Sequence, residues 1–220
     1  MGGSEADAAR WERLTAIDGQ LWKAGLLVAG VDETGRGPLA GPVVAAAVAW
    51  RAPPAGLGAL DDSKRLRPAA RQRLYDGLVA RPGAVGIGVG AVGPQTIDRL
   101  NIYEASRLAM ARALSRLPVV PEWVLTDFMP LQWRCPVEAL VHGDQRSLSV
   151  AAASVVAKVL RDRYMDALDR QYPQYGFGQH RGYPTAAHRE ALARWGASPA
   201  HRHTFAGVPP RSSTHGAHLV

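Results

Sequence analysis

Apolar segments of strand length, in a particular order along the chain, constrain the fold more than any other feature of this sequence. Three of them come early and are rich in valine, alanine and glycine, and two shorter ones come later, between helical patterns. This order indicates an antiparallel run of strands followed by strands that alternate with helices, which predicts a mixed α/β sheet. The expected strands span residues 26–31, 43–50, 85–92, 123–126 and 137–141.

Helical periodicity accounts for much of the remaining chain. Apolar residues recur at helical spacing from Ser4, a candidate N-cap, to Lys23, and Gly25 would end that helix. No linker divides the sequence, so we expect one domain over residues 1–206 and a mobile tail over residues 207–220. The expected helices span residues 4–23, 68–80, 95–117, 147–171 and 185–195.

The charge balance and the cysteine content restrict the class of protein. Lysine and arginine number 26 against 19 acidic residues, a net charge of +7, which favours a polyanionic partner such as nucleic acid. The single Cys135 allows no intramolecular disulfide, as expected in a reducing cytosol. Residues 1–13 lack the apolar region of a secretory signal, and the apolar stretch 39–50 is too short to cross a bilayer. We therefore expect a cytoplasmic protein, without membrane association.

Four carboxylates lie where expected strands end. Asp32 and Glu33 end the first strand, and Asp127 and Asp144 follow the fourth and the fifth. Acids at strand ends can converge on one edge of a sheet. Carboxylates without thiols suit Mg²⁺ or Mn²⁺ rather than zinc, and two such ions can clamp the attacking and leaving oxygens of a phosphodiester. Each acid taken alone is more often a loop cap or the partner of a surface arginine.

Two short segments have the composition of phosphate-binding loops. Gly35, Arg36 and Gly37 directly follow the acidic pair, where glycines can expose backbone N–H groups and the arginine can bind a phosphate bidentately. A plain turn between two strands explains the same residues equally well. Ser63 and Lys64 belong to a charged loop that could contact a phosphate backbone, although a solvated turn is the commoner meaning of such a loop.

Several stretches of this chain resemble the ribonuclease HII family, in order, between residues 11 and 205. AGVDETGRGPLAGPVVAAAV contains that family's D-E-x-G-R-G-P-x-A-G-P-V pattern with threonine at the variable position. The other matching stretches are DSKRL at 62–66, HGDQRSLSVAAASVVAKVLRDR at 142–163, YPQYGFGQHRGYPTAAH at 172–188 and HRHTF at 201–205.

The resemblance implies a fold and an activity. The fold would be an RNase H-like mixed β-sheet flanked by helices, with C-terminal helices, in a single catalytic domain. The activity would be hydrolysis of the RNA strand of RNA–DNA hybrids and cleavage 5′ of single ribonucleotides in duplex DNA, as in ribonucleotide excision repair. Catalysis would use two divalent ions, Mg²⁺ or Mn²⁺, and leave 3′-hydroxyl and 5′-phosphate ends. We expect the enzyme to act as a monomer.

The family's functional residues map onto this chain position by position. Its catalytic and metal-binding acids correspond to Asp32, Glu33, Asp127 and Asp144. Phe128 and His142 depart from the family pattern, in which glycine and lysine are common, and this puts the backbone path near Asp127 in doubt. The residues that the resemblance assigns to nucleic-acid binding are Gly35, Arg36, Gly37, Ser63, Lys64, Lys158 and Tyr183.

Two other functions remain to be weighed. A non-catalytic, basic nucleic-acid-binding module would explain the charge and the glycine–arginine–glycine loop, but not four acids that repel a polyanion. A dinucleotide-dependent oxidoreductase would use the G-x-G-x-x-G pattern at 88–93, but residues 105–121 contain no acid for the ribose, so we expect these glycines to thin a packed strand. The histidines His180, His188, His201 and His203 lack zinc-site spacing and are expected at the surface or next to bound phosphates.

Overall fold

A five-stranded mixed sheet forms the centre of the molecule. The computed structural model describes residues 2–52, 57, 60, 63, 66–81 and 85–210, with side chains described from residue 8. The strand order is β3-β2-β1-β4-β5, in which β1–β2 and β2–β3 are antiparallel and β1–β4 and β4–β5 are parallel. The predicted mixed α/β sheet is thus confirmed. The strands are β1 (Val28–Thr34), β2 (Val43–Trp50), β3 (Gly86–Val92), β4 (Trp123–Asp127) and β5 (Val137–Leu140).

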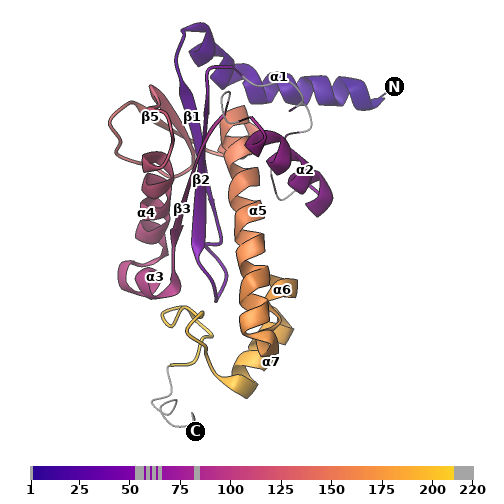
Figure 1. Ribbon diagram of the computed structural model, residues 1–220, viewed down its shortest axis with the longest axis vertical. Coiled ribbons are helices and arrows are strands. Elements are labelled where there is room, and N and C mark those ends of the chain that lie inside the picture. The colour runs from indigo at the N-terminus through magenta and orange to yellow at the C-terminus, as the bar shows by residue number, and fades with distance from the viewer. Residues whose placement is uncertain are drawn as a thin grey trace.

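Helices cover both faces of this sheet (Figure 1). The long helix α5 lies along one face, with α1 and α2 beside its first half, and α3 and α4 lie on the other face. The short C-terminal helices pack near the end of α5. The helices are α1 (Gly2–Lys23), α2 (Pro68–Val79), α3 (Pro94–Leu100), α4 (Ile102–Ser115), α5 (Leu148–Gln171), α6 (Phe177–His180) and α7 (Ala186–Trp195), with 3₁₀ turns η1 (Gly143–Gln145) and η2 (Pro173–Tyr175).

Several element boundaries differ from the prediction, and two of these differences matter here. The single helix expected over residues 95–117 is two helices, because Asn101 adopts a positive φ of 70° and caps α4 by accepting the N–H groups of Tyr103 and Glu104. Asparagine tolerates this conformation and is a favoured N-cap. The first strand also extends further than expected, so that Asp32 and Glu33 lie within β1 rather than after it.

Close helix packing explains the glycines of the sheet. A Cβ added at Gly30 of β1 would overlap the backbone of Ser149 at the start of α5. On the other face, a Cβ at Gly88 or Gly90 of β3 would overlap backbone carbonyls of α4. Gly88 and Gly90 of the pattern that matched a dinucleotide fingerprint therefore let α4 approach β3, as expected. Strand β1 contacts α5 on one face of the sheet and α4 on the other.

A buried carboxylate joins the N-terminal helix to the start of α5. Asp18 of α1 accepts the backbone N–H groups of Leu148 and Ser149, each at 3.1 Å, and also the Ser149 hydroxyl. Burial raises the pKa of Asp18, because its charge is removed from water, while these hydrogen bonds oppose that effect. The contact fixes the first turn of α5, which directly follows the segment that carries Asp144.

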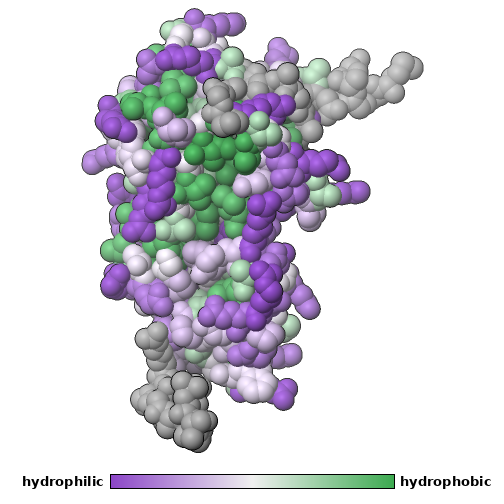
Figure 2. All heavy atoms as spheres, viewed as in Figure 1, coloured by the Kyte–Doolittle hydropathy of each residue, from purple (hydrophilic) through white to green (hydrophobic). Residues whose placement is uncertain are grey.

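The C-terminal segment packs onto the end of α5. Val208 is buried with Leu39, Met165 and Leu192, so burial continues beyond residue 206, where the sequence suggested that the domain ends. Residues 211–220 of the expected tail lie outside the described residues. In Figure 2, hydrophobic residues gather over the middle of the sheet, with hydrophilic residues along α5 beside them. No helix in the described part of the chain is long and apolar enough to span a membrane.

Candidate active site

Three parallel strands bring the predicted acids to one edge of the sheet. Val31 of β1 is paired with Thr126 of β4, and the next residue on each strand is an acid, Asp32 on β1 and Asp127 on β4. Asp127 is in turn paired with Leu140 of β5, and the chain leads from there into η1, which contains Asp144. The structure therefore brings the acids together at the carboxyl ends of these strands, as the sequence suggested.

Asp32 lies at the centre of this group of acids. Its side chain is buried, with 7% of the residue exposed. Burial raises its pKa well above the ordinary aspartate value, and the negative charges of Glu33, Asp127 and Asp144 raise that pKa further. A divalent cation would relieve both effects, because it offsets the lost solvation and the repulsion between carboxylates.

Backbone N–H groups orient two of the four acids. The Glu33 N–H donates to Oδ1 of Asp32 at 2.7 Å, and the Gly143 N–H donates to Oδ1 of Asp127 at 2.7 Å. Arg36 Nη1 donates to Oε1 of Glu33 at 3.4 Å. Among the described residues, no group of three or more His, Cys, Asp or Glu side chains is arranged to hold a metal ion. The acids converge on one edge, but their side chains would still have to adjust around an ion.

The two departures from the family pattern adopt unusual backbone conformations beside these acids. Phe128 has φ of 55° and His142 has φ of 56°, both in the left-handed region. At Phe128 the Met129 N–H donates to the Asp127 carbonyl at 2.5 Å, which closes a tight turn directly after the third acid. The Phe128 N–H donates to the Leu140 carbonyl at 2.8 Å, so the backbone still connects β4 to β5. The departure at Phe128 therefore leaves Asp127 at the sheet edge.

Replacing Phe128 with glycine should stabilise the protein. A residue with a Cβ in the left-handed region costs about 1 kcal/mol that glycine does not, and the phenylalanine side chain is 64% exposed, so little burial is lost. We expect Phe128→Gly to raise the free energy of unfolding in urea by about 1 kcal/mol. Phe128→Ala is the matched control, because it removes the ring and keeps the Cβ. Equal stability of the two variants would contradict this account.

The glycine–arginine–glycine loop and Tyr183 come together although 146 positions separate Gly37 from Tyr183 in the sequence. A Cβ added at Gly37 would lie 3.7 Å from Cε1 of the Tyr183 ring. Gly35 has φ of 90°, and a Cβ there would overlap the side chain of Arg161, so glycine is required on two grounds. Arg36 and Tyr183 are both partly exposed beside this contact, and Arg36 also reaches Glu33.

The other predicted nucleic-acid contacts lie along α5. The Ser154 hydroxyl donates to the Ser63 hydroxyl at 2.6 Å, which places the described part of the charged loop against this helix. One turn further, Lys158 Nζ pairs with Asp162 at 2.5 Å, and burial lowers the pKa of Lys158. Lys64 was predicted to bind phosphate and lies outside the described residues.

Near this site the sequence analysis did not single out two buried arginines, and it misplaced two buried histidines. Arg161 and Arg202 are fully buried and donate to backbone carbonyls, and His188 and His201 are buried and face each other, with 3.1 Å between their Nε2 atoms. The expectation of surface histidines is wrong for His188 and His201. They pack with Phe177 and Tyr175 in an aromatic cluster, which excludes water from both rings.

The buried histidines should make stability depend on pH. Burial, and after it the positive charges of His188, His203 and His180, lower the pKa of His201 to about 4, and burial also lowers the pKa of His188. The unfolded chain binds the proton near pH 6.5. Stability linked to the neutral His201 ring is therefore complete above about pH 6.5 and is lost as pH falls through about 4, by at most about 1.4 kcal/mol per pH unit.

Urea unfolding between pH 7 and pH 4 would measure this effect. The wild type should lose stability more steeply than His201→Asn, which has no ring to protonate, and the difference between the two curves removes the contribution of the acids. Parallel curves would show that His201 has the same pKa in the folded and the unfolded chain.

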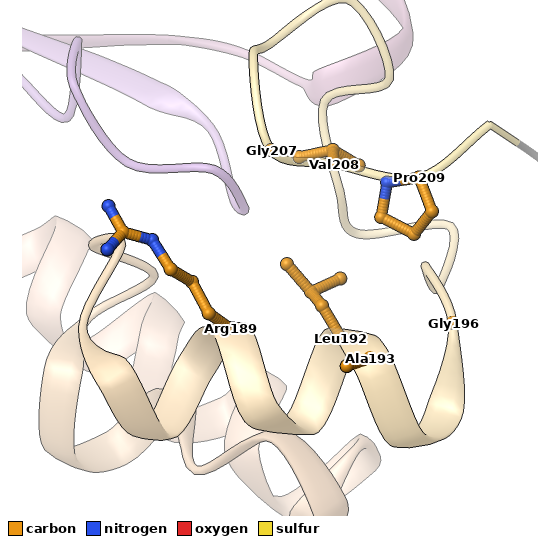
Figure 3. A pocket seen from close by; sticks show the side chains of 7 residues that line it. All are labelled: Arg189, Leu192, Ala193, Gly196, Gly207, Val208 and Pro209. Atoms are coloured by element: carbon orange, nitrogen blue, oxygen red, sulfur yellow. The ribbon is translucent and has the colours of Figure 1, made fainter.

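A separate hollow of about 490 Å³ lies between α7 and the C-terminal segment (Figure 3). Leu192 of α7 points towards Val208 and Pro209 across it, and Arg189 points away along the helix. Its lining includes none of the four acids, so it is no part of the carboxylate site.

The fold and the site together define a class of protein. The structure is similar to that of ribonuclease H2 from Pyrococcus horikoshii, with a TM-score of 0.70 and 27% identity over 83% of this chain and 95% of that one. A mixed sheet of this kind, with four acids at the carboxyl ends of its parallel strands, is that of a ribonuclease H-like nuclease.

The sequence comparisons identify the family. The family model for ribonuclease HII matches residues 29–208. Ribonuclease HII of Geobacillus kaustophilus is 52% identical over 200 residues, covering 90% of this chain and 76% of the relative, and that of Granulibacter bethesdensis is 53% identical over 191 residues, covering 83% and 85%. The chain belongs to the ribonuclease HII family. It is a ribonuclease H, a metal-dependent endonuclease of a family that acts on the RNA strand of RNA–DNA hybrids.

Proposed function

We propose that this enzyme cuts on the 5′ side of single ribonucleotides in duplex DNA, as well as within longer RNA–DNA hybrids, and leaves 3′-hydroxyl and 5′-phosphate ends. The observation that carries the proposal is the adjacency of two elements. The crowded acids around Asp32 can hold divalent ions, and the loop of Gly35 to Gly37, with Tyr183 against it, begins two residues after Glu33. Cleavage and recognition of the sugar would thus take place side by side.

The four acids suit a pair of divalent ions, Mg²⁺ or Mn²⁺. Asp32, Glu33, Asp127 and Asp144 offer only oxygen ligands, and the repulsion that raises the pKa of Asp32 favours a cation among them. Ions bound there would polarise the scissile phosphate and stabilise charge on the leaving oxygen. The protein itself orients the acids through the N–H groups of Glu33 and Gly143.

The loop and the tyrosine would read the sugar. Only the 2′-hydroxyl distinguishes a ribonucleotide from its DNA neighbours, and backbone groups of Gly35 to Gly37 can approach it closely because two of the three residues lack side chains. The Tyr183 ring, 44% exposed, would lie against the following deoxyribose, where a second 2′-hydroxyl would crowd it. Arg36, Ser63, Lys64 and Lys158 would contact the phosphate backbone.

The test is a cleavage assay on duplex DNA that contains one ribonucleotide, with Mg²⁺ or Mn²⁺, and with all-DNA duplex as control. We expect a cut on the 5′ side of the ribonucleotide, no cut in the control and no activity in EDTA. A non-catalytic nucleic-acid-binding module, the main alternative, would bind both duplexes and cut neither. Cleavage of long hybrids alone would remove the single-ribonucleotide activity from the proposal.

A further inference from the structure

The C-terminal stretch HRHTF, residues 201–205, has no role in the proposed function, yet its first two residues are buried against the sugar-reading loop. His201 is 1% exposed and Arg202 is 0% exposed. His201 forms a β-bridge with Ala40, and the Arg202 N–H donates to the Leu39 carbonyl at 2.8 Å. The C-terminal segment therefore pairs through its backbone with residues just after the glycine–arginine–glycine loop.

The Arg202 side chain holds that loop through its carbonyl groups. It donates to the carbonyl oxygens of Gly35 at 2.6 Å and Arg36 at 2.8 Å, and to that of Gly41 from two nitrogens at 3.0 Å and 2.8 Å. In a trans peptide the C=O and N–H groups point in opposite directions. Since Arg202 draws the Gly35 and Arg36 carbonyls inward, the N–H groups of Arg36 and Gly37 point away from it.

The guanidinium remains charged at neutral pH in this position. Burial, and then the positive charge of Arg161, lower the pKa of Arg202 to about 9. A planar fork of donors can bind several carbonyls at once, which the single ammonium of a lysine cannot reproduce.

His201 extends in the other direction, towards Tyr183. The Ser198 N–H donates to Nδ1 of His201 at 3.0 Å, so in the neutral ring the proton is on Nε2, which faces Nε2 of His188 at 3.1 Å. His188 is then protonated on Nδ1 and donates to the Tyr183 carbonyl at 2.9 Å. A continuous series of hydrogen bonds thus connects His201 to the backbone of Tyr183.

We propose that His201 and Arg202 are positioning residues that set the Gly35–Gly37 loop and Tyr183 at a fixed separation, and that the enzyme's preference for RNA–DNA junctions depends on this separation. The inference rests on the proposed reading of the sugar by these two elements. Its physical basis is that His201 and Arg202 are consecutive residues, whose Cα atoms lie about 3.8 Å apart. One side chain of this dipeptide holds the loop and the other holds the tyrosine, so neither element can shift without the other.

The first test uses Arg202→Lys, because alanine would leave three buried carbonyls without donors. We expect cleavage at single ribonucleotides to fall by about tenfold to a hundredfold relative to cleavage of long hybrids, mainly in kcat, since a small misplacement of reading groups is costly. Arg194→Lys on the exposed surface of α7 is the matched control and should leave the ratio unchanged. An equal loss on both substrates, in proportion to a fall in Tm, would overturn the proposal.

Two measurements on the free protein test the positioning role without a cleavage assay. Amide hydrogen exchange should rise in residues 35–42 of Arg202→Lys and stay unchanged in Arg194→Lys. Nitrogen chemical shifts of the wild type at pH 7 should show His201 protonated on Nε2 and His188 on Nδ1. Unchanged exchange, or the opposite ring tautomers, would overturn the inference. If the wild type cut neither substrate, the proposed function would fail while these two results still decided the positioning role.

Discussion

Asp32→Asn should reduce cleavage more than about a hundredfold, because loss of a metal ligand should exceed the loss seen when only a supporting contact of a ligand is removed. Asp32 is the acid whose pKa is raised by burial and by all three of the others. Asparagine keeps its shape and still accepts the Glu33 N–H through Oδ1, but it removes the charge that would bind a cation. EDTA should abolish the activity of the wild type.

The same substitution should leave folding and binding intact, which separates a ligand from a structural residue. A raised carboxylate pKa means that the charged form destabilises the folded, metal-free protein at neutral pH. In EDTA, Asp32→Asn should therefore be at least as stable as the wild type in urea. Its affinity for hybrid, measured by fluorescence anisotropy, should persist, because removing a negative charge does not weaken attraction to phosphate.

Asp76→Asn is the matched control for this experiment. Asp76 is an exposed carboxylate on α2 that accepts a hydrogen bond from Gln72 of the same helix. Its loss should affect neither cleavage nor metal dependence. Near-normal turnover of Asp32→Asn would make the assignment of the metal-binding acids wrong.

Tyr183→Ala should cause a loss of about tenfold to a hundredfold at single embedded ribonucleotides and a smaller loss on long hybrids. The backbone at Tyr183 is held independently of the ring. The Tyr183 N–H donates to the His180 carbonyl, and the Tyr183 carbonyl accepts from Thr185 and from His188. Because the ring is 44% exposed, we also expect Tm to remain close to that of the wild type.

Tyr183→Phe separates the ring from the hydroxyl. If the flat ring recognises the deoxyribose, the phenylalanine variant should keep most of the activity that alanine loses. Tyr103→Ala is the control, since Tyr103 is 41% exposed and belongs to α4, which lies on the opposite face of the sheet from α5. A fall in Tm with equal losses on both substrates would mean that Tyr183 only supports its loop, and recognition of the junction would then depend on Gly35 to Gly37 alone.

The sequence predicted the elements and the acids because both follow from local patterns. Apolar segments predicted all five strands, with errors only at their ends. The parallel pairing of β4 with β5 was not predicted, because residues 128–136 between these strands contain no helix. Acids that follow strands can converge on one edge of a sheet, which is why the sequence could suggest that Asp32, Asp127 and Asp144 lie together. Asn101 was missed as a helix break because asparagine is tolerated inside helices as well as at their caps.

A weak sequence signal did exist for the buried arginine of α5. Buried positions of this helix recur at 150, 154, 157, 161, 165 and 168, and residue 161 is an arginine on that otherwise small or apolar stripe. A charge on a buried stripe requires partners from outside the helix. The sequence does not say which partners, and these are the carbonyls of Ala40, Pro42 and Arg181.

By itself the sequence determined the class of fold, the family and the edge of the sheet at which the acids gather. These follow from local features, namely the order of apolar segments and helical patterns and the acids next to them. Only the tertiary structure decided that Gly37 faces Tyr183, that Gly35 leaves room for Arg161, and that His201 and Arg202 support both elements. Apart from the contact between His201 and His188, these contacts join residues more than a hundred positions apart. They depend on how helices and loops pack. Every residue has a backbone carbonyl, so the sequence cannot show which carbonyls accept hydrogen bonds from a buried arginine.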